Sequence, residues 1–367
     1  MAAVVDVAGL GALLDTLAGR GFTLIGPTLR DGVVVLAPIS GVDDLPRGVR
    51  DEQSPGRYRA ERTAESRLFD QAATVSTWKA YLFPSQRTLW RAADDGEPTA
   101  EPLDRVPRAL IGVRSCDLRA LAVLDTVLTG RQYADPDYAE RRSRTFVVAV
   151  TCAVPGGTCF CVSMGSGPRP DSGYDVALTE ILDDEGHRFV AEAGTDAGAS
   201  LLADLPSRIA AEEDLAASEA VAARAAASMG RAVDTTDIRD LIYASADDPH
   251  WDDVASRCLS CGNCTMVCPT CFCVTTVEPT GLAESVSRDR VWDSCFTSGH
   301  SLMHGQPVRA STASRYRQWL THKFASWQDQ FGTSGCVGCG RCVTWCPVGI
   351  DVTQELAALR RASGEDG

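Results

Sequence analysis

Cysteine is the residue type in this chain that most clearly points to a chemical role. The chain has 367 residues, and fifteen of them are cysteines. Eight fall into two identical runs of the form Cys-x2-Cys-x2-Cys-x3-Cys-Pro: Cys258, Cys261, Cys264, Cys268 and Cys336, Cys339, Cys342, Cys346. Such runs supply thiolates to [4Fe–4S] cubanes. Zinc sites more often use Cys-x2-Cys pairs separated by a longer loop. The spacing therefore predicts two [4Fe–4S] clusters.

The fourth cysteine of each run lies too far along the chain to complete the cluster of its own run, and in two-cluster proteins it ligates the other cluster. We therefore predict two interlocked ligand sets: Cys258, Cys261, Cys264 with Cys346, and Cys336, Cys339, Cys342 with Cys268. Glycines inside the runs, at 262, 338 and 340, should let the backbone coil tightly around the sulfur atoms.

Four further cysteines in the amino-terminal half each lie at the end of a strand-like run or in a glycine-rich turn: Cys116, Cys152, Cys159 and Cys161. Strand ends on one edge of a sheet can converge, and four thiolates are the number that a cubane needs. We hypothesise a third [4Fe–4S] cluster there, with Asp117 as an alternative ligand or a group that orients a ligand. The alternative is that these cysteines are small buried apolar residues.

Three cysteines remain without a set of four: Cys271, Cys273 and Cys295. We interpret them as buried thiols that pack beside a cluster, with a ligand role as the alternative.

The elements around these cysteines indicate an α+β protein. Short apolar runs alternate with helical patterns over the first 200 residues, which predicts an α/β domain; the runs are 22–26, 32–39, 108–115, 146–152, 175–182 and 187–194, and the helices 6–19 and 117–130. The amino terminus itself is interpreted as an amphipathic helix, and the charged stretch 47–66 as an exposed loop. Residues 201–230 are interpreted as a helical connector that ends at Gly230.

The pattern changes near residue 235. Residues 235–258 predict a single capped helix that leads into the first cysteine run, and residues 310–332 predict a helix with Tyr316, Trp319, Phe324 and Trp327 on one face. We therefore expect three parts: an α/β domain over 1–234 with the possible third cluster and the connector, a mostly helical ferredoxin-type dicluster domain over 235–355, and a tail over 356–367.

Several segments together resemble the iron–sulfur beta subunit of cytosolic NAD(P)-linked nickel–iron hydrogenases, also called sulfhydrogenase. They are CGNCTMVCPTCFCV, RVWDSCF, RYRQWLTHKF and CVGCGRCVTWCPVGIDV, with GVRSCDLRAL and CFCVSMGSGP upstream, and the similarity runs from roughly residue 55 to 355. The A subunit of anaerobic sulfite reductase shares this architecture. One departure is HSLMHGQPVRASTASR, which stands where an asparagine–proline–arginine sequence is expected.

The resemblance implies an electron-transfer subunit rather than a catalytic one. Its partners would be a flavin- and NAD(P)-binding subunit and the small and large subunits of a nickel–iron hydrogenase. An electron-transfer subunit of an anaerobic sulfite reductase and an iron–sulfur redox sensor are the alternatives.

Other features of the sequence limit the kinds of partner and the location that we expect for the protein. The net charge of −14 argues against nucleic acid, which selects for a basic surface. The sequence lacks an apolar run of roughly 18 residues, so no membrane association is expected. The first residues lack the basic lead of a secretory signal, and dense cysteine runs suit a reducing compartment. We therefore expect a cytoplasmic protein.

Overall fold

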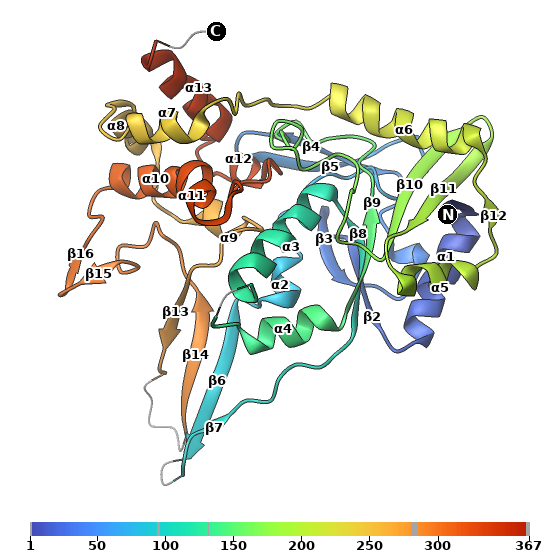
Figure 1. Cartoon of the computed structure of the whole chain (residues 1–367), viewed down its shortest axis with the longest axis horizontal. Coiled ribbons are helices and arrows are strands. Elements are labelled where there is room, and N and C mark those ends of the chain that lie inside the picture. Colours follow the sequence, from blue (N-terminus) through green and yellow to red (C-terminus); the bar gives the residue numbers. More distant parts are fainter. Residues whose placement is uncertain (1, 94–95, 131, 280–284, 365–367) are drawn as a thin grey trace.

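An eight-stranded mixed sheet organises the amino-terminal half of the chain in the computed structural model, which describes residues 2–93, 96–130, 132–279 and 285–364 (Figure 1). Its strand order is β12-β1-β11-β10-β9-β8-β2-β3. The central strands β10, β9, β8 and β2 run parallel, while the outer neighbours pair antiparallel. The bounds are β1 Ala2–Asp6, β2 Thr23–Arg30, β3 Val33–Pro38, β8 Arg108–Val113, β9 Thr145–Val150, β10 Val176–Asp183, β11 Gly186–Ala193 and β12 Arg208–Ile209.

Helices cover both faces of this sheet because the buried strands are apolar on both sides. Val148 faces a core with α1 (Val7–Gly19) and α5 (Asp196–Ala203), whereas Val147 faces the core with α2 (Lys79–Leu82), α3 (Ser115–Leu128) and α4 (Pro136–Ser143). Helix α6 (Glu212–Ala227) packs through Val221 onto Val190 and its neighbours. A three-layer α/β unit results.

The carboxy-terminal part is a group of short helices around a second apolar core (Figure 1). The helices are α7 Ile238–Ala244, α8 His250–Arg257, α9 Asn263–Met266, α10 Thr312–Thr321, α11 Trp327–Phe331, α12 Arg341–Thr344 and α13 Val352–Ala362. A π-helical turn, His322–Ser326, joins α10 to α11. All four aromatic residues predicted to share one face, from Tyr316 to Trp327, are buried. The predicted α+β class is confirmed.

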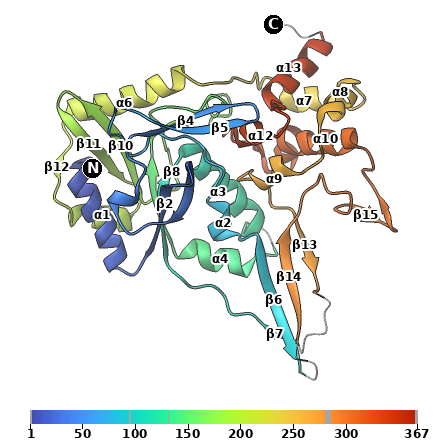
Figure 2. The ribbon, with the colours of Figure 1, turned by 180° about the vertical axis from the view of Figure 1, so that it is seen from behind.

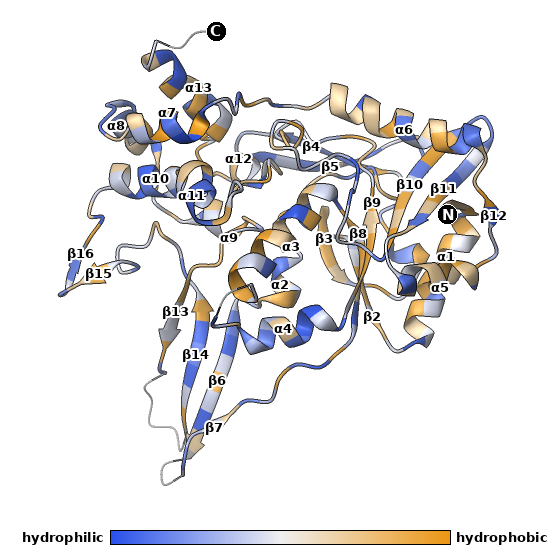
Figure 3. Ribbon diagram, in the orientation of Figure 1, coloured by the Kyte–Doolittle hydropathy of each residue, from blue (hydrophilic) through white to orange (hydrophobic). Residues whose placement is uncertain are grey.

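A long hydrophilic arm projects from the molecule and joins the two parts (Figures 2 and 3). It is a four-stranded sheet of order β13-β14-β6-β7, with β6 Gln86–Ala93, β7 Thr99–Ala100, β13 Val274–Val277 and β14 Ser285–Trp292. Because β14 pairs with β6, the arm crosses the boundary that we expected near residue 235. A small hairpin, β15 Leu302–Met303 with β16 Gln306–Pro307, follows it. The sequence patterns did not predict either feature.

Residues 47–66 are not the exposed loop that we expected. They form the hairpin β4 (Val49–Ser54) and β5 (Arg57–Arg62), preceded by a 3-10 turn, Val42–Asp44. Side chains of β4 are alternately buried, including those of Asp51 and Gln53. The charged side chains of this segment are therefore partly internal, which a composition argument cannot foresee.

Four other expectations about elements were wrong in detail. The amino terminus begins with strand β1, which pairs with β11, and α1 starts only at Val7. Helix α6 packs on the sheet instead of serving as a connector, and residues 235–258 form two helices, since Pro249 precedes α8. Helix α13 continues past residue 355, where we placed the start of a tail, and buries Leu356 and Leu359. Among the described residues, no helix is long and apolar enough to cross a membrane.

Candidate iron–sulfur site

The first cysteine run begins where α8 ends. Cys258 follows Arg257, the last residue of that helix, and its own N–H closes the helix on Val254 and Ala255. Gly262, with φ of +74°, turns the chain into α9, which carries Cys264. The N–H of Ser260 donates to Cys258 Sγ at 3.4 Å. The backbone thus coils around the thiols, as the glycine in the run predicted.

The second run repeats this local structure. Gly338 and Gly340 have φ of +66° and +73°, and α12 carries Cys342 as α9 carries Cys264. The N–H of Gly338 donates to Cys336 Sγ at 3.5 Å, and the N–H of Ile350 donates to Cys346 Sγ at 3.3 Å. Helices α9 and α12 lie in contact, and the side chain of Asn263 donates to the carbonyl of Trp345. The two runs therefore face each other.

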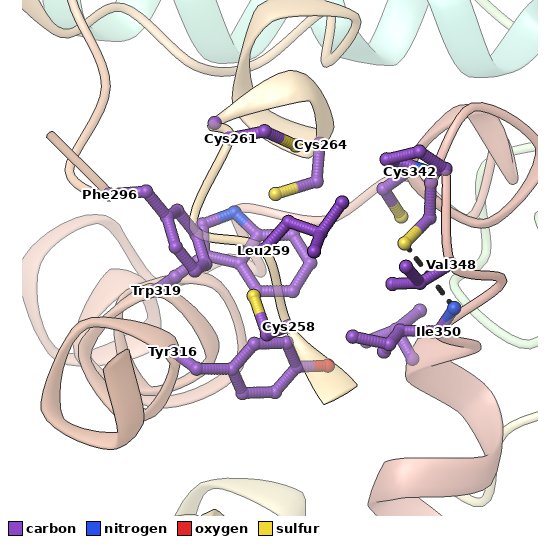
Figure 4. A pocket seen from close by; sticks show the side chains of 14 residues that line it. Cys258, Leu259, Cys261, Cys264, Phe296, Tyr316, Trp319, Cys342, Val348 and Ile350 are labelled. Carbon is purple, nitrogen blue, oxygen red and sulfur yellow. Dashed lines mark hydrogen bonds between the residues drawn. The ribbon is translucent and has the colours of Figure 1, made fainter. Parts of the chain in front are cut away.

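A first cavity of about 460 Å³ lies where α8, α9 and the end of the second run meet (Figure 4). Its walls combine the cysteines with apolar residues that include Leu259, Phe296, Val348 and Ile350. The cysteines on its walls are Cys258, Cys261, Cys264, Cys342 and Cys346. The structure thus brings the four cysteines of the first predicted ligand set to one cavity. Burial raises the pKa of the Cys264 thiol.

A second cavity of about 360 Å³ lies beside the first. Cys268 reaches it from the first run, and the other cysteines on its walls are Cys336, Cys339 and Cys342. The structure thus brings together the second predicted set as well. Cys342 and Trp319 line both cavities, so the cavities share a wall.

The donors around these cavities fit iron–sulfur clusters. The hydroxyl of Tyr316 and the indole N–H of Trp319 are buried, and neither has a hydrogen-bond partner within the described part of the chain. Both rings lie at the first cavity (Figure 4). A buried unpaired donor costs about 1–3 kcal/mol, and cluster sulfur atoms would accept these bonds. No three His, Cys, Asp or Glu side chains of the described residues converge to hold a single metal ion; the cysteines surround cavities instead.

A buried lysine, Lys323, places a positive charge on the wall of the second cavity. Lys323 Nζ donates to Cys268 Sγ at 3.2 Å and to Thr270 Oγ1 at 3.1 Å. Burial opposes the charged lysine, but the surrounding cysteines outweigh burial and raise the pKa of Lys323. The Cys271 thiol and Lys323 both donate to Cys268 and hold its pKa well below the usual value. The lowered pKa favours the thiolate form of Cys268, which is the form that binds iron.

The amino-terminal cysteines lie directly behind the second cavity. Cys116 is in the first turn of α3 and packs with Cys161 and Cys339. The Cys159 thiol is 3.8 Å from the carbonyl oxygen of Cys339. Cys152 follows β9, and its thiol accepts a hydrogen bond from Arg114. Burial raises the thiol pKa values across the group, to about 12 for Cys161.

Arg341 connects this group to the second cavity. Its side chain is 2% exposed and donates to both oxygens of Asp117, at 2.9 and 3.4 Å, and to the carbonyl of Thr74 at 2.8 Å. Burial opposes the charge of Arg341, but Asp117 and Cys339 outweigh burial and raise its pKa. Asp117, expected as an alternative ligand or an orienting group, has both oxygens engaged by Arg341. This arrangement favours the orienting role.

The β4–β5 hairpin belongs to the site, although the sequence did not point to it. Gly56, at its turn, donates its N–H to the carbonyl of Val343 at 3.1 Å, and Tyr58 stacks on Trp345 with ring centroids 5.1 Å apart. Gln53 accepts from Thr158 and Thr344, each at 3.1 Å. The hairpin therefore fastens α12 to the amino-terminal unit. A Gly-containing turn between two alternating segments was the signal that could have revealed it.

Comparisons with known proteins agree with these cavities. Residues 257–350 match a family described as a 4Fe–4S dicluster domain, which implies two [4Fe–4S] clusters. The chain is also similar to the protein named sulfhydrogenase 2 subunit beta of Pyrococcus furiosus, with 32% identity over 263 residues, 68% of this chain and 73% of the relative. The predicted resemblance is confirmed: the chain is an iron–sulfur electron-transfer subunit that belongs to the sulfhydrogenase beta subunit family.

Proposed function

We propose that this chain relays electrons within a heteromeric nickel–iron hydrogenase, between a flavin- and NAD(P)-binding subunit and the small and large nickel–iron subunits. The observation that carries the proposal is the shared wall of the two cysteine-lined cavities, formed by Cys342 and Trp319. Bound [4Fe–4S] clusters would accept and release single electrons. The chain's own residues bind and insulate them, and a relay of this kind needs no catalytic side chain.

The cavities support the interlocked ligand sets as part of this proposal. In the first cavity, Cys258, Cys261 and Cys264 would hold a cluster with Cys346 from the second run. In the second cavity, Cys336, Cys339 and Cys342 would hold one with Cys268 from the first run. Because each set takes ligands from both runs, assembly of the clusters should be coupled to folding of α9 against α12.

We also propose a third [4Fe–4S] cluster at the amino-terminal cysteines. Its support is geometric: Cys116 packs with Cys161, which shares the loop 158–162 with Cys159, and Cys152 follows β9, which pairs with the strand β8 that precedes Cys116. Their position behind Cys339 would extend the relay from the second cavity into the α/β unit. Iron and sulfide analysis of anaerobically purified protein tests this cluster: Cys159→Ala should remove about four irons per chain, and an unchanged iron content would refute it.

A cytoplasmic location completes the proposal. All fifteen cysteines are unpaired, and a reducing compartment keeps thiols in the form that binds iron.

The decisive experiment for the complex is affinity purification of the full chain under anaerobic conditions, followed by metal analysis of the co-purifying subunits. We expect nickel, a flavin and NAD(P)-dependent reduction of the clusters. Siroheme in place of nickel would instead indicate the sulfite reductase complex. Absence of reversible one-electron transitions in a redox titration would contradict the relay and favour a sensor.

A further inference from the structure

The three cysteines outside the sets of four line a cavity of their own. This third cavity, of about 390 Å³, is bordered by Cys271, Cys273 and Cys295. Trp319, whose indole N–H lacks a partner within the described residues, lies on the walls of all three cavities. The third cavity is thus built like the two cluster cavities, from cysteines and buried aromatic rings.

Two of these cysteines belong to a repeated pentapeptide. Thr-Cys-Phe-Cys-Val occurs at 158–162, which contains Cys159 and Cys161, and again at 270–274. Both copies contact the start of the second run: the N–H of Phe160 donates to the carbonyl of Gly338, and Thr270 Oγ1 donates to the carbonyl of Gly335. Both copies therefore present a Cys-x-Cys pair next to the second cluster cavity.

The arm supplies the third cysteine. Cys273 directly precedes β13, and Cys295 lies shortly after β14, which pairs antiparallel with β13. The N–H of Asp293 donates to the carbonyl of Cys273 at 2.9 Å, and the N–H of Cys295 donates to the Cys273 thiol. The base of the arm therefore fixes the positions of these two thiols relative to each other.

Two buried lysines lie at or next to the same cavity. Lys323 lies on its wall, and Lys79, which is 2% exposed, donates to the carbonyl of Cys271 at 2.9 Å. Lys79 also lies over the ring of Trp292, 3.8 Å from its centroid. Buried lysines require anionic partners. Cys268 is one such partner for Lys323, and thiolates at Cys271, Cys273 and Cys295 with a bound cluster would add negative charge beside both lysines.

His322 is the remaining side chain on the wall of a type that commonly ligates iron. It lies in the π-helical turn between α10 and α11, next to Lys323, and its ring packs against Phe272 and Trp327. Such turns occur often at functional sites.

We propose that Cys271, Cys273 and Cys295 hold an additional [4Fe–4S] cluster, with His322 at the fourth position. The inference goes beyond the relay proposed above and does not depend on the amino-terminal cluster or on the catalytic partner. The cluster would lie at the root of the arm, beside the two clusters of the dicluster domain.

Iron, zinc and sulfide analysis of the full chain, purified anaerobically, tests the site. Cys273→Ala and Cys295→Ala should each remove about four irons and leave the electron paramagnetic resonance signals of the other clusters intact. Val274→Ser, at an exposed neighbour of Cys273, should remove none. Unchanged iron content, zinc in place of iron, or a Cys273–Cys295 disulfide in the wild-type chain would overturn the proposal.

A second measurement keeps the proposal testable if those variants fail to fold. Native mass spectrometry of Cys159→Ala should count about twelve irons if this site is filled, and about eight would refute it. If Cys159→Ala has the same iron content as the wild-type chain and that content is about twelve, the amino-terminal cluster is refuted and this one stands. His322→Cys should keep the iron but shift the potential of a single cluster, which a purely structural histidine would not do.

Discussion

The first and second cavities are built from two copies of the same cysteine motif, yet they differ in exposure and charge. The rim of the first is apolar and open: Leu259 is 63% exposed, Val348 is 43% exposed, and Cys261 is at the surface. The second lies against the amino-terminal unit and has two buried cations on its walls, Lys323 and Arg341. A repeated motif thus determines where a cluster binds, while the surroundings determine how the cluster behaves.

This difference bears on the direction of the relay. A positive charge next to a cluster stabilises its reduced, more negative state and raises its potential. We therefore expect the second cluster to have the higher potential of the two, and the first, at the open rim, to exchange electrons with a partner.

The largest effect should come from the cysteine that, in the proposed ligand sets, each run gives to the other. Cys268→Ser should abolish the cluster of the second cavity and spare the first, and Cys346→Ser should do the reverse, because each serine removes one thiolate from the set of the opposite run. Anaerobic electron paramagnetic resonance of the reduced variants distinguishes the two clusters. If Cys268→Ser instead abolished the first cluster and kept the second, each run would bind its own fourth cysteine.

Replacing a glycine by alanine should destabilise the protein more in the second cysteine run than in the first. Gly262 and Gly340 have nearly the same φ, so an alanine at either position costs about 1–2 kcal/mol from the left-handed conformation. A Cβ at Gly262 meets the rotatable side chain of Ser294 at 2.8 Å, whereas a Cβ at Gly340 meets the backbone carbonyl of Thr158. Gly340→Ala should therefore be less stable than Gly262→Ala by a further ~1–3 kcal/mol.

Anaerobic denaturant unfolding, followed by cluster absorbance, measures this difference. If the two alanine variants lost the same free energy of unfolding, the contact with Thr158 would relax without cost. The amino-terminal unit would then not be tightly fastened to the second run.

The sequence predicted the part of the site that depends on local spacing. Two runs of four cysteines were enough to expect which cysteines gather at each cavity, and positive φ at Gly338 and Gly340 follows from the same coil. Alternating apolar runs were likewise enough for the sheet. These features depend on neighbours in the chain, so a pattern can reveal them.

The parts that sequence reasoning missed depend on contacts between distant segments. The β4–β5 hairpin is rich in charge, and only its packing on α12 explains why Gln53 and Asp51 are buried. Strand β14 pairs with β6 nearly 200 residues earlier, which no local signal indicates. Lys323 looks like a surface residue of an amphipathic helix, and its burial becomes intelligible only once Cys268 is seen beside it.

Removal of that lysine should lower the potential of the second cluster. Hydrogen bonds to charged groups contribute about 1.5–3 kcal/mol, which for a one-electron couple is roughly 65–130 mV. Lys323→Met should lower the reduction potential of the second cluster by that amount and leave the potential of the first cluster nearly unchanged. A spectroelectrochemical titration measures both potentials, with Arg317→Gln, a partly exposed cation on α10, as the control. Equal shifts of both clusters would show that the charge is not specific to the second cavity.

The smallest effect should distinguish the two unpaired donors. Tyr316 lines the first cavity, whereas Trp319 lines both. A neutral hydrogen bond to a cluster is worth about 0.5–1.5 kcal/mol, or roughly 20–65 mV for one electron. Tyr316→Phe should therefore lower the potential of the first cluster alone.

Trp319→Phe is the matching variant at the shared wall. It should lower the potential of whichever cluster accepts the hydrogen bond from the indole N–H. Tyr243→Phe serves as the control, because that hydroxyl is exposed and already donates to Asp329 at 2.6 Å. If neither Tyr316→Phe nor Trp319→Phe moves a potential, the buried donors do not contact cluster sulfur, and the difference between the cavities would depend on charge and exposure alone.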